Sequence, residues 1–323
     1  KLMRQGTTTA AWGEYPTATQ PNWNVIQTGA YPGTSGVYDM TIHLPGEPLD
    51  VVHSAFDGRF NRAETIWQVM DKLGKKVFLF KYPGTWPPKL KNGYQVDGHC
   101  APSGLIQFHW GSSKVAVHPN RCYTTDEYRA ANKIAFQPAK EWTRMPESAS
   151  PPLESEIAVV PGPGEIRYHL LLIGSGGQGY DQVVISPQRD ASRAVARLKV
   201  GQYSDFIIAR FKIPGQPISG SFRMKLMELS PDAKHFKLFV SQVYPTEKFT
   251  YPNSLSQELI KACGPFLEYT GMQPLYLGWI DDQTFMDTIN YHTQWVGKAV
   301  NYVLAKYKWD LFMMQWHPID FSE

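Results

Sequence analysis

The sequence predicts an α/β fold interrupted by a β-rich insertion. A helical pattern over 61–73 leads into the continuous apolar run Val77–Phe80, and a second helical pattern over about 282–306 leads into another apolar run at 310–316. Between about 128 and 250, short apolar runs alternate with Gly, Pro, Ser and Asp turns, which is typical of strands. Continuous apolar strands beside helices indicate a parallel sheet covered on both faces, so the two flanks are expected to share one sheet.

The first elements surround a short helix. Residues 1–5 are expected to form the last turn of a helix that ends at Gly6, and 7–12 a short strand. Pro21 suits the first helical position, because its ring presets φ and its missing N–H would be unpaired there. Gly29 suits the C-terminus of that helix, where a left-handed residue is needed.

A second helix is expected after residue 61. Asn61 is its predicted cap, with Glu64 reaching back as in a capping box. The apolar spacing predicts that this helix buries Ile66, Trp67, Met70 and Leu73. Gly74 is expected to end it, and a buried strand follows over 76–80.

The C-terminal part returns to helix. Helices are predicted at 254–263 and from about 282 to 306, where the second is expected to bury Phe285, Met286, Ile289, Val296, Ala299, Val300, Val303 and Leu304. The glycine-rich stretch 175–179 looks like a phosphate-binding loop. Since neither Lys-Ser/Thr nor a Rossmann helix follows it, we interpret it as a hairpin turn.

Bulk properties exclude several classes of protein. The 323 residues allow one large α/β domain or a core with an insertion, and the net charge of +3 comes from scattered Lys and Arg. Scattered cations argue against a nucleic-acid surface, and no apolar run is long enough to span a membrane. The three cysteines have no metal-ligand spacing. Cys100 and Cys122 could pair or could remain free thiols, and no compartment follows from the sequence.

The strongest functional signal is a pair of linked blocks. The first contains Thr19, Pro21 and Asn22, and the second contains Thr28, Gly29, Pro32, Gly36 and Val37. Thr19 lies where unpaired N–H groups and the helix dipole favour negative charge, which suits a nucleophile that attacks a phosphoryl group. The alternative is an ordinary helix that starts near a proline, with Thr19 as its N-cap and no chemistry.

These blocks resemble the type I phosphodiesterase/nucleotide pyrophosphatase branch of the alkaline phosphatase superfamily. The resemblance implies a three-layer α/β/α catalytic core, here incomplete and cut at both ends, formed by 1–127 and 251–323, with 128–250 as the β-rich insertion. It also implies metal-dependent hydrolysis of small phosphate mono- or diesters.

The resemblance also assigns the site residues. Thr19 is the nucleophile and a metal ligand, and Asp320 is a second metal ligand. Two divalent cations, zinc or alternatively manganese, are implied for the intact protein, because a metal lowers the pKa of the weakly nucleophilic hydroxyl. Asp39 lies near the place where the family has an Asn. The expected partners of the phosphoryl oxygen are therefore Asn22 and the backbone N–H of Gln20.

Several alternatives stay open. The remaining ligands are expected outside this chain, so the chain by itself is predicted to be inactive; His317 could replace a missing ligand or be structural. His43, His53 and His99 could contact substrate or serve only in packing. The protein could instead be a phosphonate hydrolase or another metalloenzyme of the superfamily, or a non-catalytic binding protein that uses aromatic loops such as 82–88.

Overall fold

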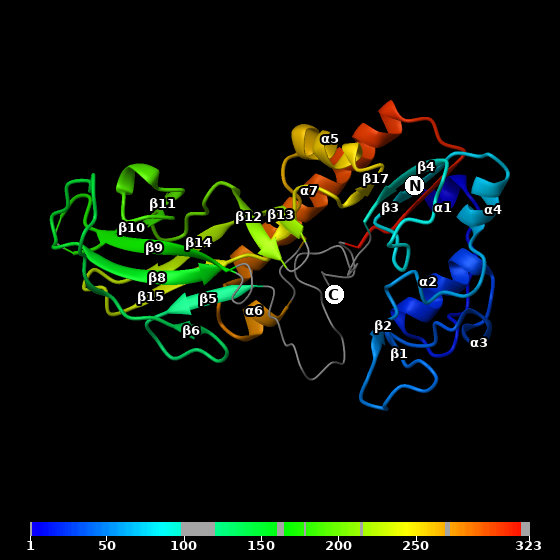
Figure 1. Ribbon diagram of the computed structural model, residues 1–323, viewed down its shortest axis with the longest axis horizontal. Helices are drawn as coiled ribbons and strands as arrows, with labels where there is room; N and C mark the ends of the chain where they lie inside the picture. The colour runs from blue at the N-terminus through cyan, green and yellow to red at the C-terminus, as the bar shows by residue number, and fades with distance from the viewer. Residues whose placement is uncertain are drawn as a thin grey trace. The chain divides into compact units, whose positions relative to one another are not determined.

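The computed structural model divides into two compact units (Figure 1). Within the described residues, the first unit contains 2–97 and 308–315, and the second contains 120–307 together with 316 and 317. The residues described are 2–97, 120–159, 165–177, 179–213, 216–268 and 272–317.

Parallel strands form the centre of the first unit. Strand β3 (Val77–Phe80) pairs in parallel with β4 (Gly93–Val96) on one side and with β18 (Leu311–Met314) on the other. All four residues of β3 are fully buried, as a strand covered on both faces should be. The prediction that the two flanks share one sheet is therefore confirmed, although β18 is only half-buried.

The remaining elements of the first unit are short. Helix α1 (Leu2–Gln5) confirms the predicted helical turn before Gly6. The strand expected over 7–12 is wrong: these residues are exposed and belong to no strand, and Trp12 is fully exposed. An apolar pattern makes a strand only where a neighbouring edge can pair with it. The unit also contains α2 (Thr19–Thr28), α3 (Pro32–Ser35) and the two-stranded ribbon β1 (Thr41–Ile42) and β2 (His53–Ser54).

Helix α4 (Ile66–Lys72) begins one turn later than predicted. Its N-cap is Thr65, whose hydroxyl accepts the N–H of Gln68 while the side chain of Gln68 accepts the N–H of Thr65 at 2.8 Å. The cap predicted at Asn61 is wrong, since the Asn61 amide oxygen accepts the N–H of Ala63 at 3.0 Å in a local turn. The stretches that begin at Asn61 and at Thr65 both have the spacing of a capping box, and the backbone becomes helical only after Thr65.

The buried face of α4 is narrower than predicted. Trp67 is buried, whereas Ile66 and Leu73 are exposed and Met70 is half-buried. Gly74 follows the helix with a φ of 71°, as expected of a terminating glycine.

The second unit is rich in antiparallel strands. One sheet has the order β11-β10-β9-β8-β7, a second β14-β15-β5-β6 and a third β12-β13-β16. The pairs between these strands are antiparallel except for β5 with β6, so the strands predicted for 128–250 are confirmed. The strands of these sheets are β5 (Arg121–Thr124), β6 (Asn132–Lys133), β7 (Gln137–Pro138), β8 (Leu153–Val159), β9 (Ile166–Ile173), β10 (Gln182–Ser186), β11 (Ala196–Leu198), β12 (Ile207–Ile213), β13 (Gln216–Phe222), β14 (Met224–Leu229), β15 (Phe236–Val240) and β16 (Tyr244–Pro245). A further short strand, β17 (Thr250–Tyr251), lies outside these three sheets.

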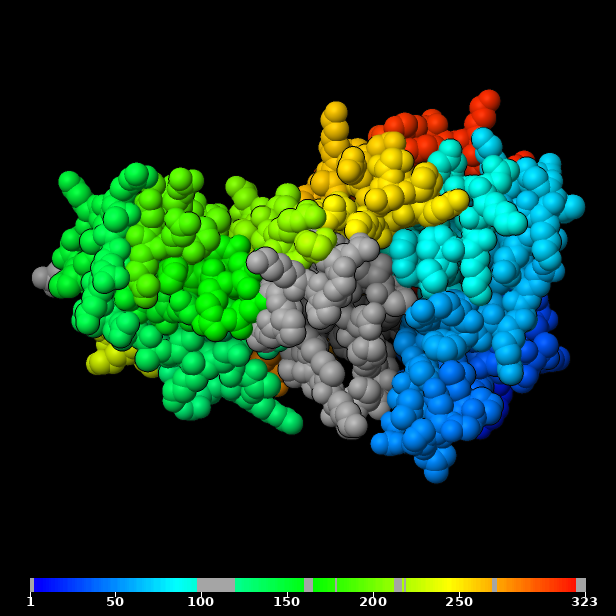
Figure 2. Space-filling view, viewed as in Figure 1, coloured from blue at the N-terminus to red at the C-terminus, as the bar shows by residue number. Residues whose placement is uncertain are grey.

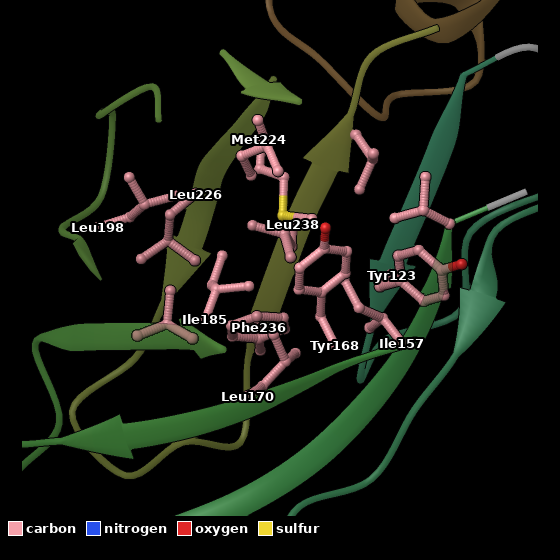
Figure 3. Packing of buried hydrophobic residues seen from close by; sticks show 14 of the residues in the cluster. Tyr123, Ile157, Tyr168, Leu170, Ile185, Leu198, Met224, Leu226, Phe236 and Leu238 are labelled. Carbon is pink, nitrogen blue, oxygen red and sulfur yellow. The ribbon is translucent and has the colours of Figure 1, made fainter. Parts of the chain in front are cut away.

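One apolar core joins these sheets. Figure 3 shows side chains from several strands meeting there, among them Leu170 of β9, Ile185 of β10, Met224 of β14 and Phe236 of β15. In the space-filling view of Figure 2, the green atoms of this unit form one continuous surface on the face shown. Strand β5 contributes Tyr123 to this core although it precedes residue 128. The boundaries of the proposed insertion stay a prediction.

The glycine-rich stretch 175–179 is the turn between β9 and β10, as predicted. The carboxylate of Asp181 accepts the backbone N–H of Ser175 at 2.7 Å and its hydroxyl at 2.6 Å. Gln178 lies outside the described residues. This local use of the serine fits a hairpin turn and not a phosphate-binding loop.

Helices complete the second unit. Helices α5 (Ser254–Cys263) and α7 (Asp282–Lys306) confirm the predicted helices, and α6 (Gln273–Tyr276) lies between them. Five of the eight positions predicted to be buried in α7 are buried, while Met286 and Leu304 are exposed and Val300 is half-buried. None of the helices described here is long and apolar enough to cross a membrane.

Candidate active site

Helix α2 places Thr19 in its first turn. The N-cap is Ala18, with a φ of −94° and a ψ of 160°, and Thr19 is the first helical residue. The prediction that Pro21 is the first helical residue is wrong by two positions, but Pro21 still lies in the first turn, where a missing N–H breaks no helical bond. The predicted end is confirmed: Gly29 has a φ of 65°, and its N–H donates to the Val25 carbonyl at 2.8 Å.

Thr19 is exposed. Since Ala18 holds the N-cap position, the interpretation of Thr19 as a plain helix cap does not describe this helix. The N–H groups of a first turn have no partner inside their own helix and carry the positive end of its dipole. An exposed hydroxyl beside such N–H groups can face a phosphoryl group.

The side chain and the backbone N–H of Gln20 lie in different surroundings. The side chain is buried, with 2% of its surface exposed, and Nε2 donates to the Ala55 carbonyl at 2.8 Å. The backbone N–H lies in the first turn of α2. The role predicted for that N–H toward a phosphoryl oxygen stays a prediction.

Asn22 binds the chain that leads into α2. Its Nδ2 donates to the Ala18 carbonyl at 2.8 Å, and its Oδ1 accepts the N–H of Glu14 at 2.7 Å. These bonds hold the segment 14–18 against the helix. The amide is thus engaged in local bonds, and its predicted role as a substrate ligand stays a prediction.

The second block shapes the backbone around α2. Gly36 ends α3 with a φ of 80°, and a Cβ there would lie 2.7 Å from Nε of Arg62. Val37 is buried with Ile42 and Ala55 in one small cluster. Since the carbonyl of Ala55 accepts the Gln20 amide, the two blocks are linked through this cluster.

The other candidate residues have local partners or lie elsewhere. The Asp39 carboxylate accepts the N–H of Met40 at 2.7 Å. The His53 Nε2 lies 2.7 Å from a carboxylate oxygen of Glu47, and His43 Nδ1 lies 2.9 Å from the Val51 carbonyl. These local bonds indicate that both histidines stabilise the loop around β1 and β2.

Asp320, His99 and Cys100 lie outside the described residues. His317 is half-buried and belongs to the second unit, whereas Thr19 belongs to the first. Cys122 and Cys263 are free thiols, and burial raises the pKa of Cys122 to about 12. Of the predicted site residues, the structure brings together Thr19, Gln20 and Asn22.

The described residues do not by themselves fit a catalytic metal centre. Over the ranges that the structure covers, no group of three or more His, Cys, Asp or Glu side chains could hold a metal ion. A catalytic zinc usually has three protein ligands. Of the two ligands that the resemblance assigns, Thr19 lies within the described residues and Asp320 does not, and a single hydroxyl cannot fix the geometry of an ion.

Two further residues, Asn24 and Gln27, were not predicted from the sequence and are buried on the same face of α2 as the Gln20 side chain. A signal for them existed. Three amides recur at the spacing of one helix face, where apolar residues would be expected.

The comparisons with known proteins give one family match. The family described as type I phosphodiesterase/nucleotide pyrophosphatase matches residues 1–160, a range that includes both blocks, α2 and β3. No curated protein and no solved structure matches the chain. This family hydrolyses phosphate esters, acts on small substrates and is generally metal-dependent. Residues 1–160, just under half of the chain, thus match the type I phosphodiesterase/nucleotide pyrophosphatase family, and this match supports a phosphoester hydrolase.

Proposed function

We propose that the protein hydrolyses small phosphate mono- or diesters with Thr19 as its nucleophile. One observation carries this proposal. Within the range that matches the family, Thr19 is an exposed hydroxyl residue in the first turn of a ten-residue helix. The helix dipole and the free N–H groups favour a phosphate there.

The chemistry follows from that position. The Thr19 oxygen attacks phosphorus in line, the bond from phosphorus to the leaving alcohol breaks, and a covalent phosphothreonine forms. Water then attacks the same phosphorus and releases the threonine hydroxyl. The Gln20 N–H lies next to the attacking residue and is the proposed donor to a phosphoryl oxygen in both steps, with Asn22 as a second donor.

We also propose a metal centre and a core scaffold that extend beyond the described residues. Two divalent ions, zinc or manganese, are proposed for the intact protein, with Thr19 and Asp320 among their ligands. The proposed scaffold is a three-layer α/β/α core made of 1–127 and 251–323, with 128–250 inserted. The mixed α/β architecture, the parallel β4-β3-β18 arrangement and the family match support this scaffold.

The test is Thr19→Ala in the full-length protein, with Thr19→Ser as the matched control. With bis(4-nitrophenyl) phosphate as substrate and divalent metal present, loss of the nucleophile should lower kcat by several orders of magnitude. Serine retains the hydroxyl and should retain measurable turnover. Near-normal turnover of Thr19→Ala would remove Thr19 from the reaction. A phosphonate ester assayed in parallel distinguishes a phosphonate hydrolase.

A further inference from the structure

Helix α2 buries amide side chains where an apolar face would be expected. Its buried residues include Gln20, Asn24 and Gln27, which share one face and are each at most 3% exposed. In contrast, Ile26 is 63% exposed. A surface helix normally packs through an apolar stripe, which tolerates small shifts along the helix axis. Hydrogen bonds of buried amides are directional, so they fix position more narrowly.

The amides meet the loop that follows β3. A Cβ built on Gly84 would lie 3.0 Å from Nε2 of Gln20, 3.8 Å from Nε2 of Gln27 and 3.9 Å from the Ala55 carbonyl oxygen. Gln20 donates to that same carbonyl at 2.8 Å. The amide ends of two helix residues, the Ala55 carbonyl and the Gly84 backbone therefore share one small region.

This receiving loop is itself held in place. Gln95 of β4 donates to the backbone carbonyl of Thr85 at 2.9 Å, and the Thr85 hydroxyl donates to the Tyr82 carbonyl at 2.8 Å. The N–H of Gly58 donates to the Trp86 carbonyl at 2.8 Å. Gly84 and Thr85 follow β3, so the loop lies beyond the carboxyl end of a central parallel strand, where ligands bind in open α/β sheets.

We propose that Gln20 is a positioning residue for Thr19: its bond to Ala55 sets the first turn of α2, and with it the Thr19 hydroxyl, against the loop after β3. This inference rests on the proposed role of Thr19 as nucleophile. Gln20 follows Thr19 directly, whereas Gln27 lies two turns further along the same buried face. A displacement of about 1 Å at the reacting group can lower a rate by roughly 100-fold.

Gln20→Met and Gln27→Met form a matched pair, because both remove a buried amide from the same face of α2 and replace it with a side chain of similar length. Gln20→Met should lower kcat about 10- to 100-fold with KM within about twofold of wild type, since positioning acts on the reacting atoms. Gln27→Met should leave kcat within about twofold, by the same reasoning.

A second measurement needs no turnover. Asn22 donates its N–H to the Ala18 carbonyl, so amide exchange at Asn22 reports on the first turn. Loss of the Gln20 bond should speed this exchange about tenfold, as expected for one buried hydrogen bond. Gln27→Met should leave it unchanged.

The outcomes separate the inference from the proposed function. If Thr19→Ala abolishes turnover while Gln20→Met retains wild-type kcat and exchange, Gln20 positions nothing and the inference is overturned. If both glutamine variants lower kcat equally, the amides serve stability alone, which also overturns it. If Thr19→Ala is active, the proposed function fails, and the inference falls with it even where the exchange data show that Gln20 orders the turn.

Discussion

Replacement of Gly84 by alanine tests the close contact between α2 and the loop after β3. Gly84 has a φ of 70°, and a Cβ there would lie 3.0 Å from Nε2 of Gln20. Gly74 is a matched control in the same unit: its φ is 71°, and a Cβ there would meet nothing within 4 Å. Both substitutions introduce the same backbone strain, but only the alanine at Gly84 would press against the Gln20 amide.

The expected magnitudes follow from these contacts. An alanine in the left-handed region costs about 1–2 kcal/mol, and this applies at both positions. At Gly84 the Gln20 amide must also move by a few tenths of an ångström, which stretches or breaks its bond to Ala55. A buried donor left without its acceptor costs about 1–3 kcal/mol. Gly84→Ala should therefore lower stability by about 2–5 kcal/mol and Gly74→Ala by about 1–2 kcal/mol.

The assay must resolve the first unit, because a chain with two units need not unfold in one two-state step. Hydrogen exchange of peptides from β3 and β4, measured as a function of urea, gives the opening free energy of that unit. Equal losses for Gly84→Ala and Gly74→Ala would refute the reasoning. They would mean that the Gln20 amide yields freely and does not fix α2.

Two further predictions concern other parts of the chain. Hydrogen bonds from Lys306 and Tyr307 lower the pKa of Glu258 in the folded protein. The stability that these bonds give is therefore fully present above the unfolded pKa of about 4.3 and is lost as pH falls through the lower folded pKa. Glu258→Gln should remove this acid-dependent loss of thermal stability, and a pH profile of thermal stability equal to that of the wild type would contradict the prediction. Thr65→Ala should destabilise the first unit by about 1 kcal/mol through loss of the α4 cap, and Asn61→Ala should destabilise it by less. If hydrogen exchange of α4 showed a larger loss of stability for Asn61→Ala than for Thr65→Ala, the assignment of Thr65 as the cap would be contradicted.

Much of the fold was predictable because it depends on local patterns. The run Val77–Phe80 has no polar residue, which indicated a strand buried on both faces, and the structure bears this out. Gly29 and Gly74 were predictable ends of helices, since both need a left-handed backbone. The antiparallel strands of the second unit followed from their alternating runs and their turns.

Other elements were ambiguous at the level of local sequence. Asn61 and Thr65 each begin a stretch with the spacing of a capping box, and nothing local decides between them. The apolar spacing of α4 predicted a wide buried face, but tertiary contacts cover Trp67 and leave Leu73 exposed. Burial depends on what packs against a helix, which its own sequence does not specify.

Some features of the candidate site were predictable from the sequence, and others appeared only in the tertiary structure. The sequence alone indicated the family that residues 1–160 match and the position of Thr19 near the start of a helix, because the two blocks carry that information in their residues and spacing. Only the tertiary structure showed that the Gln20 side chain binds the Ala55 carbonyl and that Gly84 lies against it. These contacts join residues far apart in the chain, so they depend on how α2 packs on the loop after β3, and no local pattern encodes that packing.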